Sequence, residues 1–268
     1  MALPEPAASS TALITGASAG IGEATARELA SRGHGVTLVA RREERLRSLA
    51  GELSDRFGVR AEALGADLGS ETARADLVRR IQELGLEVEI LVNNAGFGGG
   101  EDFVGTDREL LTSMVELNCV ALLDLQGAYL PRMVERGRGA VVNIASTAAF
   151  QPLPGSATYA ATKAFVLSLS EAVHEELKGT GVTLTAVCPG PVKTEFMDVA
   201  GLSGAEAQLP GVFWMSAESV AKAAVEAADD GKRAIVPGIL NRAGAITGQH
   251  VPRMLGLPVA KRVWRRAL

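Results

Sequence analysis

Short apolar segments alternate with longer amphipathic segments along most of this chain. The apolar segments have the β-branched, buried character of strands and occupy residues 11–15, 35–40, 60–66, 89–92, 140–145, 182–187 and 233–236. Helix-like periodicity marks the segments 20–32, 42–57, 71–84, 107–134, 157–178 and 216–230. Strands and helices that alternate in this way are joined by right-handed crossovers. The pattern therefore predicts an α/β fold, with a doubly wound parallel sheet in the middle of three α/β/α layers.

The length of 268 residues fits one domain of this kind, since α/β folds of about 250 residues commonly share one core. We expect a disordered lead-in over residues 1–9, one domain over 10–238 and a basic, helical C-terminal extension over 239–268. The segment 189–215 interrupts the alternation and is rich in Pro and Gly. Long excursions of this kind in compact domains are often functional.

Charge and cysteine usage narrow the class of protein. The formal net charge of −4 argues against a general nucleic-acid binder, which needs a basic surface. Cys119 and Cys188 lie in apolar segments without metal-ligand spacing, so we expect reduced core residues and no metal site. The start of the chain lacks a secretory pattern and no window reaches about 18 apolar residues, which predicts a cytosolic protein.

The first predicted strand leads into "TGASAGIG", residues 15–22, with glycines at 16, 20 and 22. Glycine at a strand-to-helix turn lets the backbone approach a pyrophosphate, which then meets the free N–H groups of the helix. A tight turn that needs positive φ is the structural alternative. Arg41 and Arg42 follow the end of the second predicted strand. A site for NAD would be expected to have an acidic residue there, whereas guanidinium groups favour the 2′-phosphate of NADP. Both could instead belong to the solvated first turn of a helix.

Tyr159 and Lys163 are four residues apart in a predicted helix, which places them on one face with Cβ atoms about 5–6 Å apart. An ammonium held there favours tyrosinate and should lower the phenol pKa. Such a tyrosine can donate a proton to a developing alkoxide or remove one from an alcohol. The two residues could also form a surface pair.

In order along the chain, several motifs resemble the classical short-chain dehydrogenase/reductase family, over roughly residues 11–238. These are "TGASAGIG", "NNAG" (93–96), Asn118, Ser146, "YAATK" (159–163) and "PGPVKT" (189–194). The resemblance implies a Rossmann fold that transfers a hydride between a nicotinamide cofactor and a carbonyl compound or alcohol. It also implies a homodimer or homotetramer, formed through the helices near 107–134 and 157–178.

By this resemblance, Tyr159 is the general acid and base, and Lys163 lowers its pKa and binds the nicotinamide ribose. Ser146 would steady the substrate oxygen, and Asn118 would hold a water in a proton relay. The alternatives are a turn cap for Ser146 and an ordinary polar helix position for Asn118.

The resemblance further implies that Asp67 contacts the adenine, "NNAG" the adenosine side, and Thr194 the nicotinamide carboxamide. Asp67 could be a plain helix N-terminal residue, and Asn93 with Asn94 a turn stabiliser. The residues expected to contact the cofactor are Gly16, Ser18, Ala19, Gly20, Ile21, Gly22, Arg41, Arg42, Asp67, Leu68, Asn94, Ala95, Gly96, Tyr159, Lys163, Pro189, Gly190, Val192 and Thr194. The cofactor expected is NADP(H) in preference to NAD(H).

A water-poor pocket for a hydrophobic substrate needs apolar cover. The candidates are Phe97, Phe150, Phe196, Met197, Phe213, Trp214 and Met215, several of them in the excursion 189–215. They could equally belong to the core or to an oligomer contact.

The C-terminal extension is a separate electrostatic region. From Leu240 onward there are six Arg or Lys and no acid, which leaves 21 basic against 31 acidic residues in the rest of the chain. The extension could dock on its own domain, cover the active site, contact a partner subunit or lie on an anionic membrane.

The sequence thus predicts an NADP-dependent carbonyl reductase or alcohol dehydrogenase of unspecified substrate. One rival is a nucleotide-sensing regulatory or scaffold protein on the same fold, since fold alone does not fix function. Another is a membrane-surface or partner-binding protein that acts through its extension. The intact set of Asn118, Ser146, Tyr159 and Lys163 favours the enzyme.

Overall fold

The computed structural model describes residues 3–99, 102–196, 210–254, 256–258 and 261. Its strands are β1 (Ser10–Thr15), β2 (Val36–Ala40), β3 (Ala61–Gly65), β4 (Glu87–Asn93), β5 (Gly139–Ile144), β6 (Val182–Val187) and β7 (Ala234–Ile235). Its α-helices are α1 (Gly20–Ser31), α2 (Glu43–Phe57), α3 (Glu71–Glu83), α4 (Arg108–Val115), α5 (Ala121–Arg136), α6 (Ala157–Glu176), α8 (Ala217–Asp229) and α9 (Ile239–His250). Short turns of other helix types are η1 (Glu116–Val120), η2 (Thr147–Phe150) and η4 (Gly211–Phe213).

The seven strands form one sheet in the order β3-β2-β1-β4-β5-β6-β7, and every pairing is parallel. The chain reverses its direction of winding between β1 and β4, which are neighbours in the sheet. This confirms the predicted doubly wound fold. Ligands of such sheets bind beyond the carboxyl ends of the strands at the reversal.

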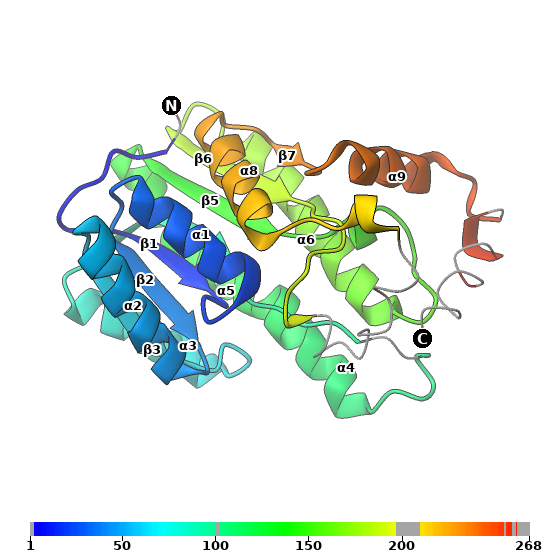
Figure 1. Ribbon diagram of the computed structural model, residues 1–268, viewed down its shortest axis with the longest axis horizontal. Coiled ribbons are helices and arrows are strands. Elements are labelled where there is room, and N and C mark those ends of the chain that lie inside the picture. Colours follow the sequence, from blue (N-terminus) through cyan, green and yellow to red (C-terminus); the bar gives the residue numbers. More distant parts are fainter. Residues whose placement is uncertain (1–2, 100–101, 197–209, 255, 259–260, 262–268) are drawn as a thin grey trace.

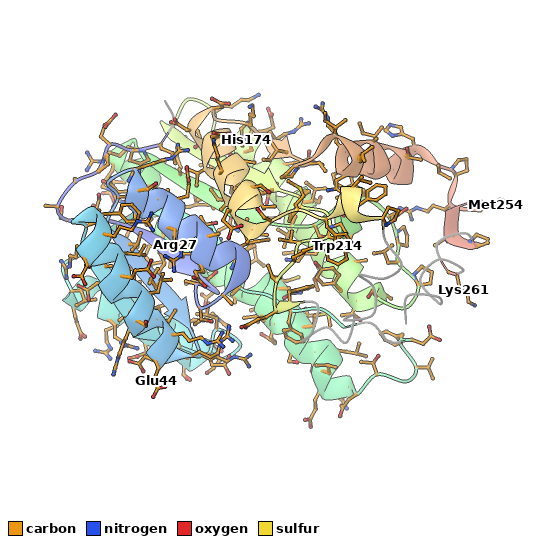
Figure 2. All side chains as sticks on the ribbon, viewed as in Figure 1. Arg27, Glu44, His174, Trp214, Met254 and Lys261 are labelled. Carbon is orange, nitrogen blue, oxygen red and sulfur yellow. The ribbon has the colours of Figure 1, made fainter. Side chains whose placement is uncertain are left out.

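Helices cover both faces of the sheet, because the strands are apolar on both sides (Figure 1). In β1, Ala12 and Ile14 join the core formed with α1, α2 and α8, whereas Leu13 joins the core formed with α3 and α5. Charged side chains connect the outer surfaces of the helices. Arg27 of α1, for example, bridges to Glu52 of α2 (Figure 2).

The predicted helix over 107–134 is three elements. The π-helical turn η1 separates α4 from α5, and Asn118 lies within it. A π-turn inserts one residue into the helical repeat and is frequent at functional sites. Periodicity alone does not reveal it, because the apolar stripe continues on both sides of the turn.

Residues 3–9 differ from the expected disordered lead-in. Leu3 packs against the core, and its N–H donates to Asp229 Oδ1 at 3.4 Å. The carbonyl of Ser9 accepts from the Glu87 N–H at 2.8 Å. Two anchoring contacts therefore hold this segment against the domain.

The beginning of the C-terminal extension docks on the domain as α9, which packs against η2 and η4. Figure 1 shows α9 in orange at the right of the view. Asn241 and Ala245 of α9 are buried, and the Asn241 Nδ2 donates to the Phe213 carbonyl at 3.1 Å. Both cysteines are buried and free, as expected. No helix in the described part of the chain is long and apolar enough to cross a membrane.

Candidate active site

A cavity of about 880 Å³ opens at the carboxyl ends of the strands. Among the residues predicted to contact a cofactor, all line this cavity except Gly22. Ser146, Tyr159 and Lys163 line it too, and so do Phe97, Phe150, Phe196 and Phe213. The fold therefore brings most of the predicted cofactor residues, three of the four predicted catalytic residues and these four phenylalanines together from distant parts of the sequence.

The glycine turn is shaped by two close approaches. Gly16 has φ of +66°, and a Cβ there would lie 2.7 Å from Asn94 Nδ2. A Cβ on Gly22 would lie 2.4 Å from the Gly16 carbonyl oxygen, so Gly22 permits the tight packing of α1 behind the cavity rather than lining it. The first turn of α1 borders the cavity, and no side chain of the described residues caps it. Such a helix start can bind an anion with its backbone N–H groups.

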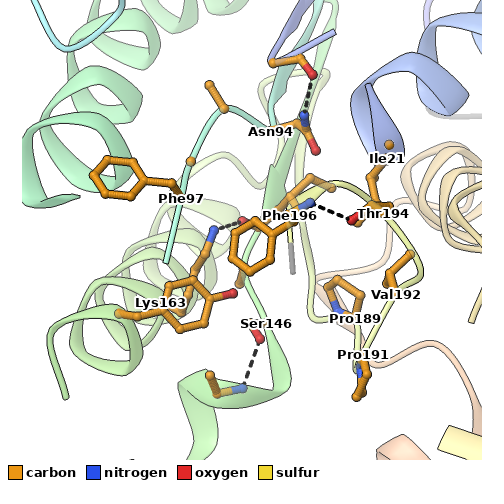
Figure 3. Close-up of a pocket in the computed structure, with 18 of the residues that line it drawn as sticks. Ile21, Asn94, Phe97, Ser146, Lys163, Pro189, Pro191, Val192, Thr194 and Phe196 are labelled. Carbon is orange, nitrogen blue, oxygen red and sulfur yellow. Dashed lines mark hydrogen bonds between the residues drawn. The ribbon is translucent and has the colours of Figure 1, made fainter. Parts of the chain in front are cut away.

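Asn94 holds the end of β4 against the end of β1. Its Nδ2 donates to the Gly16 carbonyl at 3.3 Å (Figure 3) and to the Thr15 carbonyl at 2.9 Å. The N–H groups of Asn94 and Ala95 both donate to Thr15 Oγ1 at 2.9 Å. The Asn94 side chain is therefore used within the protein, as the turn-stabiliser interpretation expects, while its residue still lines the cavity.

Three arginines are grouped at one corner of the cavity, and two of them, Arg41 and Arg42, line it. Arg42 donates from Nε and Nη2 to Ser18 Oγ, at 3.1 and 3.0 Å, and from Nη1 to Glu195 Oε2 at 2.6 Å. Arg45 donates to the other Glu195 oxygen at 2.7 Å. Arg41 is exposed, lines the cavity and makes no ion pair with any described residue. The sequence analysis did not identify Glu195, although it directly follows the "PGPVKT" motif.

Lys163 is buried on the inner face of α6. Its Nζ donates to the Ile144 carbonyl at 2.8 Å, at the end of β5 (Figure 3). Burial lowers the pKa of Lys163 to about 8, because the charged ammonium is removed from water. The buried position excludes the surface-pair alternative.

Tyr159 behaves differently from the prediction. Burial raises the pKa of Tyr159 above its usual value, and a hydrogen bond with the Ser146 side chain acts in the opposite direction. The predicted lowering by Lys163 is therefore wrong for this structure, in which the Lys163 Nζ lies 5.8 Å from the Tyr159 ring centroid and is directed to a main-chain oxygen. Desolvation of the phenolate is the largest influence on this pKa. Tyr159 is consequently a protonated phenol at neutral pH.

Ser146 follows β5 and has two contacts. Its Oγ accepts from the Ala148 N–H at 3.1 Å, which caps η2, and its side chain bonds with Tyr159. The cap fixes the direction of the hydroxyl (Figure 3). The turn-cap and site interpretations of Ser146 are thus compatible.

Asn118 is buried and does not line the cavity. Its Nδ2 donates to the Phe97 carbonyl at 2.9 Å and to Thr162 Oγ1 at 3.0 Å, while its Oδ1 accepts from the Phe97 N–H at 3.0 Å. Both amide hydrogens are used by the protein. The side chain therefore ties the loop after β4 to the residue that precedes Lys163.

The apolar part of the cavity comes from several segments. The Phe196 ring lies 5.7 Å from the Tyr159 ring. Trp214 and Met215 do not line the cavity, and Met197 falls outside the described residues. The sequence analysis missed further wall residues, namely Leu117, Leu153, Leu240, Asn241, Gly244 and Ala245. Four of these come from α9. This helix is far from the motifs in the sequence, and no pattern in the sequence indicates that it reaches the cavity.

Comparison with known proteins agrees with this geometry. Residues 10–201 match the family of short chain dehydrogenases. A very-long-chain 3-oxoacyl-CoA reductase of Anas platyrhynchos is 35% identical over 199 residues, which cover 73% of this chain and 64% of that protein's own length.

Two solved structures are similar over nearly the whole chain. A short-chain dehydrogenase from Sphingobium yanoikuyae in complex with NADPH has a TM-score of 0.79 and 38% identity, covering 93% of this chain and 95% of that one. The bulky-bulky ketone specific alcohol dehydrogenase from Comamonas testosteroni has a TM-score of 0.75 and 32% identity, covering 96% and 94%. The chain belongs to the short-chain dehydrogenase family and is a short-chain NAD(P)-dependent oxidoreductase.

Proposed function

We propose that this protein is an NADP(H)-preferring oxidoreductase that interconverts a hydrophobic carbonyl compound and its secondary alcohol. The observation that carries the proposal is that Ser146, Tyr159 and Lys163 line the same cavity as the glycine turn of α1. A regulatory protein that only sensed the nucleotide would not need a phenol and a buried ammonium in that cavity.

The described residues fit a dinucleotide. The uncapped first turn of α1 would hold the pyrophosphate, Asp67 the adenine and Thr194 the carboxamide end. When bound, the cofactor supplies or accepts the hydride.

The side chains of this chain handle the proton. Tyr159 is protonated at neutral pH and suits the donation of a proton to a carbonyl oxygen. Ser146, oriented by its cap on η2, donates a hydrogen bond to the same oxygen. Lys163 sits on the same face of α6 and contributes a positive charge when protonated.

Preference for NADP(H) rests on Arg41 and Arg42, which border the cavity after β2. The similar short-chain dehydrogenase from Sphingobium yanoikuyae is in complex with NADPH, and so is the similar L-sorbose reductase from Gluconobacter frateurii. These neighbours support the preference by analogy.

A hydrophobic substrate is supported by the four phenylalanines in the cavity. The similar enzyme from Comamonas testosteroni is specific for bulky-bulky ketones. We therefore expect ketones with apolar groups on both sides of the carbonyl to be better substrates than small polar aldehydes.

A homo-oligomer and a cytosolic location remain predictions. Exposed apolar side chains on α4, α5 and α6 support the oligomer, among them Leu110, Leu123 and Phe165. Sedimentation of the purified protein distinguishes a monomer from a dimer or tetramer.

The function is tested with purified protein, NADPH or NADH, and a panel of hydrophobic ketones and aldehydes. Loss of the absorbance of the reduced cofactor, with alcohol identified by mass spectrometry, is the expected result. Tight NADPH binding without turnover across a broad panel would instead favour the nucleotide-sensing alternative.

A further inference from the structure

Glu195 fills a position between two guanidinium groups at the corner of the cavity. Its carboxylate oxygens accept from Arg42 at 2.6 Å and from Arg45 at 2.7 Å. The Arg42 nitrogens Nε and Nη2 donate to Ser18 Oγ and Nη1 donates to Glu195, so each of the three guanidinium nitrogens has a partner. The pKa of Glu195 is held below its usual value by Arg45 and Arg42, and the group is therefore a carboxylate at neutral pH.

Two guanidinium groups and a hydroxyl form an anion site of the kind that binds phosphate. This corner is also where the 2′-phosphate of NADP(H) would lie in the proposed function, since Arg42 follows β2 and Ser18 belongs to the glycine turn. An acidic side chain in the same corner is the feature that the function does not require.

We propose that the Glu195 carboxylate competes with the cofactor 2′-phosphate for Arg42, and so restrains selectivity for NADP(H) over NAD(H). This inference rests on the proposed cofactor site. A phosphate that binds Arg42 must replace Glu195 as its partner or lie beside a second negative charge. NAD(H) lacks that phosphate and leaves the pair of Glu195 with Arg42 intact.

The competition also connects the cofactor to the substrate side of the cavity. Glu195 lies between Thr194 and Phe196 in the chain. Thr194 packs over α1, because a Cβ on Gly20 would lie 3.0 Å from its methyl group, and the Phe196 ring borders Tyr159. Loss of the Arg42 partner would therefore remove one of the two ion pairs that hold Glu195, the residue that joins Thr194 to Phe196, and leave the pair with Arg45.

The expected effect is moderate, because these side chains are exposed: 45% for Arg42, 53% for Arg45 and 48% for Glu195. Exposed ion pairs contribute little free energy, and salt screens them. Glu195→Gln should lower the Kd for NADPH about three- to fivefold at low ionic strength, with the Kd for NADH changed less than about twofold. High salt should reduce the difference.

Glu44→Gln is the matched control. Glu44 lies on the exposed side of α2, beside Arg45 in sequence, and makes no ion pair with any described residue (Figure 2). The Glu44→Gln substitution removes one negative charge near the same arginines but no ion pair with them. The ratio of the Kd for NADPH to the Kd for NADH should therefore stay within about twofold of its value in the unaltered protein. Adenosine 2′,5′-bisphosphate and 5′-AMP serve as probes of the phosphate site without nicotinamide, and their ratio should follow that of NADPH and NADH.

Each outcome bears on the competition. A selective gain for NADPH and for the bisphosphate in Glu195→Gln alone supports it. Equal shifts for NADPH and NADH, weaker NADPH binding, or an equal effect of Glu44→Gln would overturn it. If the unaltered protein prefers NADH, the proposed cofactor preference is wrong, but the competition still predicts a shift toward NADPH in Glu195→Gln. Turnover is measured separately, so absence of catalysis leaves this comparison of Kd values intact.

Discussion

Burial sets the protonation of the two central side chains. Lys163 and Tyr159 share the inner face of α6, and removal from water favours the neutral form of each. The sequence predicted their proximity correctly, because a four-residue spacing on a helix fixes it. It predicted the wrong direction for the tyrosine pKa, since the depth of each group depends on the packing of β5 and α6. The sequence likewise does not predict the ion pair of Arg42 with Glu195, because the two residues are 153 positions apart in the chain.

Replacement of Lys163 by Met should stabilise the fold at neutral pH. The pKa of Lys163 falls from 10.5 to about 8 on folding, so below pH 8 a charged ammonium is buried at a cost of up to about 3 kcal/mol. Between pH 8 and 10.5 the unfolded chain binds more protons than the folded one, and this cost disappears as pH rises. Urea unfolding should therefore show that Lys163→Met is more stable than the unaltered protein at pH 7, with a gain that shrinks toward pH 10.5. A gain independent of pH would contradict the buried charge.

Arg41 is the arginine available to a 2′-phosphate without the loss of an ion pair. Arg41→Ala should weaken NADPH binding by about 10- to 100-fold, the range for a charge-assisted hydrogen bond, and NADH binding by far less. Arg47→Ala is the control, since Arg47 is on α2 and does not line the cavity. Fluorescence titration of both nucleotides measures the effect. Equal weakening of NADPH and NADH binding would show that Arg41 is a solvent-exposed residue of the helix turn and does not bind the 2′-phosphate.

Most elements follow from sequence periodicity, because strands buried on both faces and amphipathic helices carry distinct patterns. Each predicted range that corresponds to one observed element agrees with it within two residues at either end. The exception is the helix over 107–134, where η1 interrupts the hydrogen-bonding pattern around Asn118. The buried amide of Asn118 holds Phe97, which lines the cavity, and Thr162, which precedes Lys163.

Asn118→Ala should therefore cost stability as well as activity. It leaves the Phe97 carbonyl and N–H without their side-chain partner and removes the donor to the Thr162 hydroxyl, which keeps its bond to the Tyr159 carbonyl. The expected loss is about 1–3 kcal/mol in the free energy of unfolding. Because the loop at Phe97 borders the cavity, kcat should fall as well. Urea unfolding and steady-state kinetics measure both, and Asn118→Ala with unchanged stability would show that these contacts contribute nothing.

The topology of the whole molecule is also predictable, because right-handed crossovers leave few ways to arrange alternating strands and helices. The sequence does not predict which segments close the cavity. Its walls include α9 and Phe213, and Asn241 joins these two segments through a single side-chain bond. Such contacts depend on how the extension returns to the domain, which no local pattern encodes.

Two truncations test the role of α9. A chain that ends at residue 250 keeps α9 and should retain turnover. A chain that ends at residue 238 loses Leu240, Asn241, Gly244 and Ala245 from the wall, so KM for hydrophobic ketones should rise more than about tenfold while NADPH still binds. Thermal melting of both chains checks that the domain remains folded. Equal loss of turnover in the two chains would place the function of the extension beyond residue 250.

The central claim is that Tyr159 supplies the proton for carbonyl reduction with NADPH. The most direct measurement compares the unaltered protein with Tyr159→Phe, using NADPH titration and turnover of one hydrophobic ketone on the same preparations. The variant loses the hydroxyl and keeps the ring, so NADPH should bind within about threefold of normal while kcat falls by at least about 100-fold. Substantial turnover in a Tyr159→Phe protein that binds NADPH normally would contradict the claim.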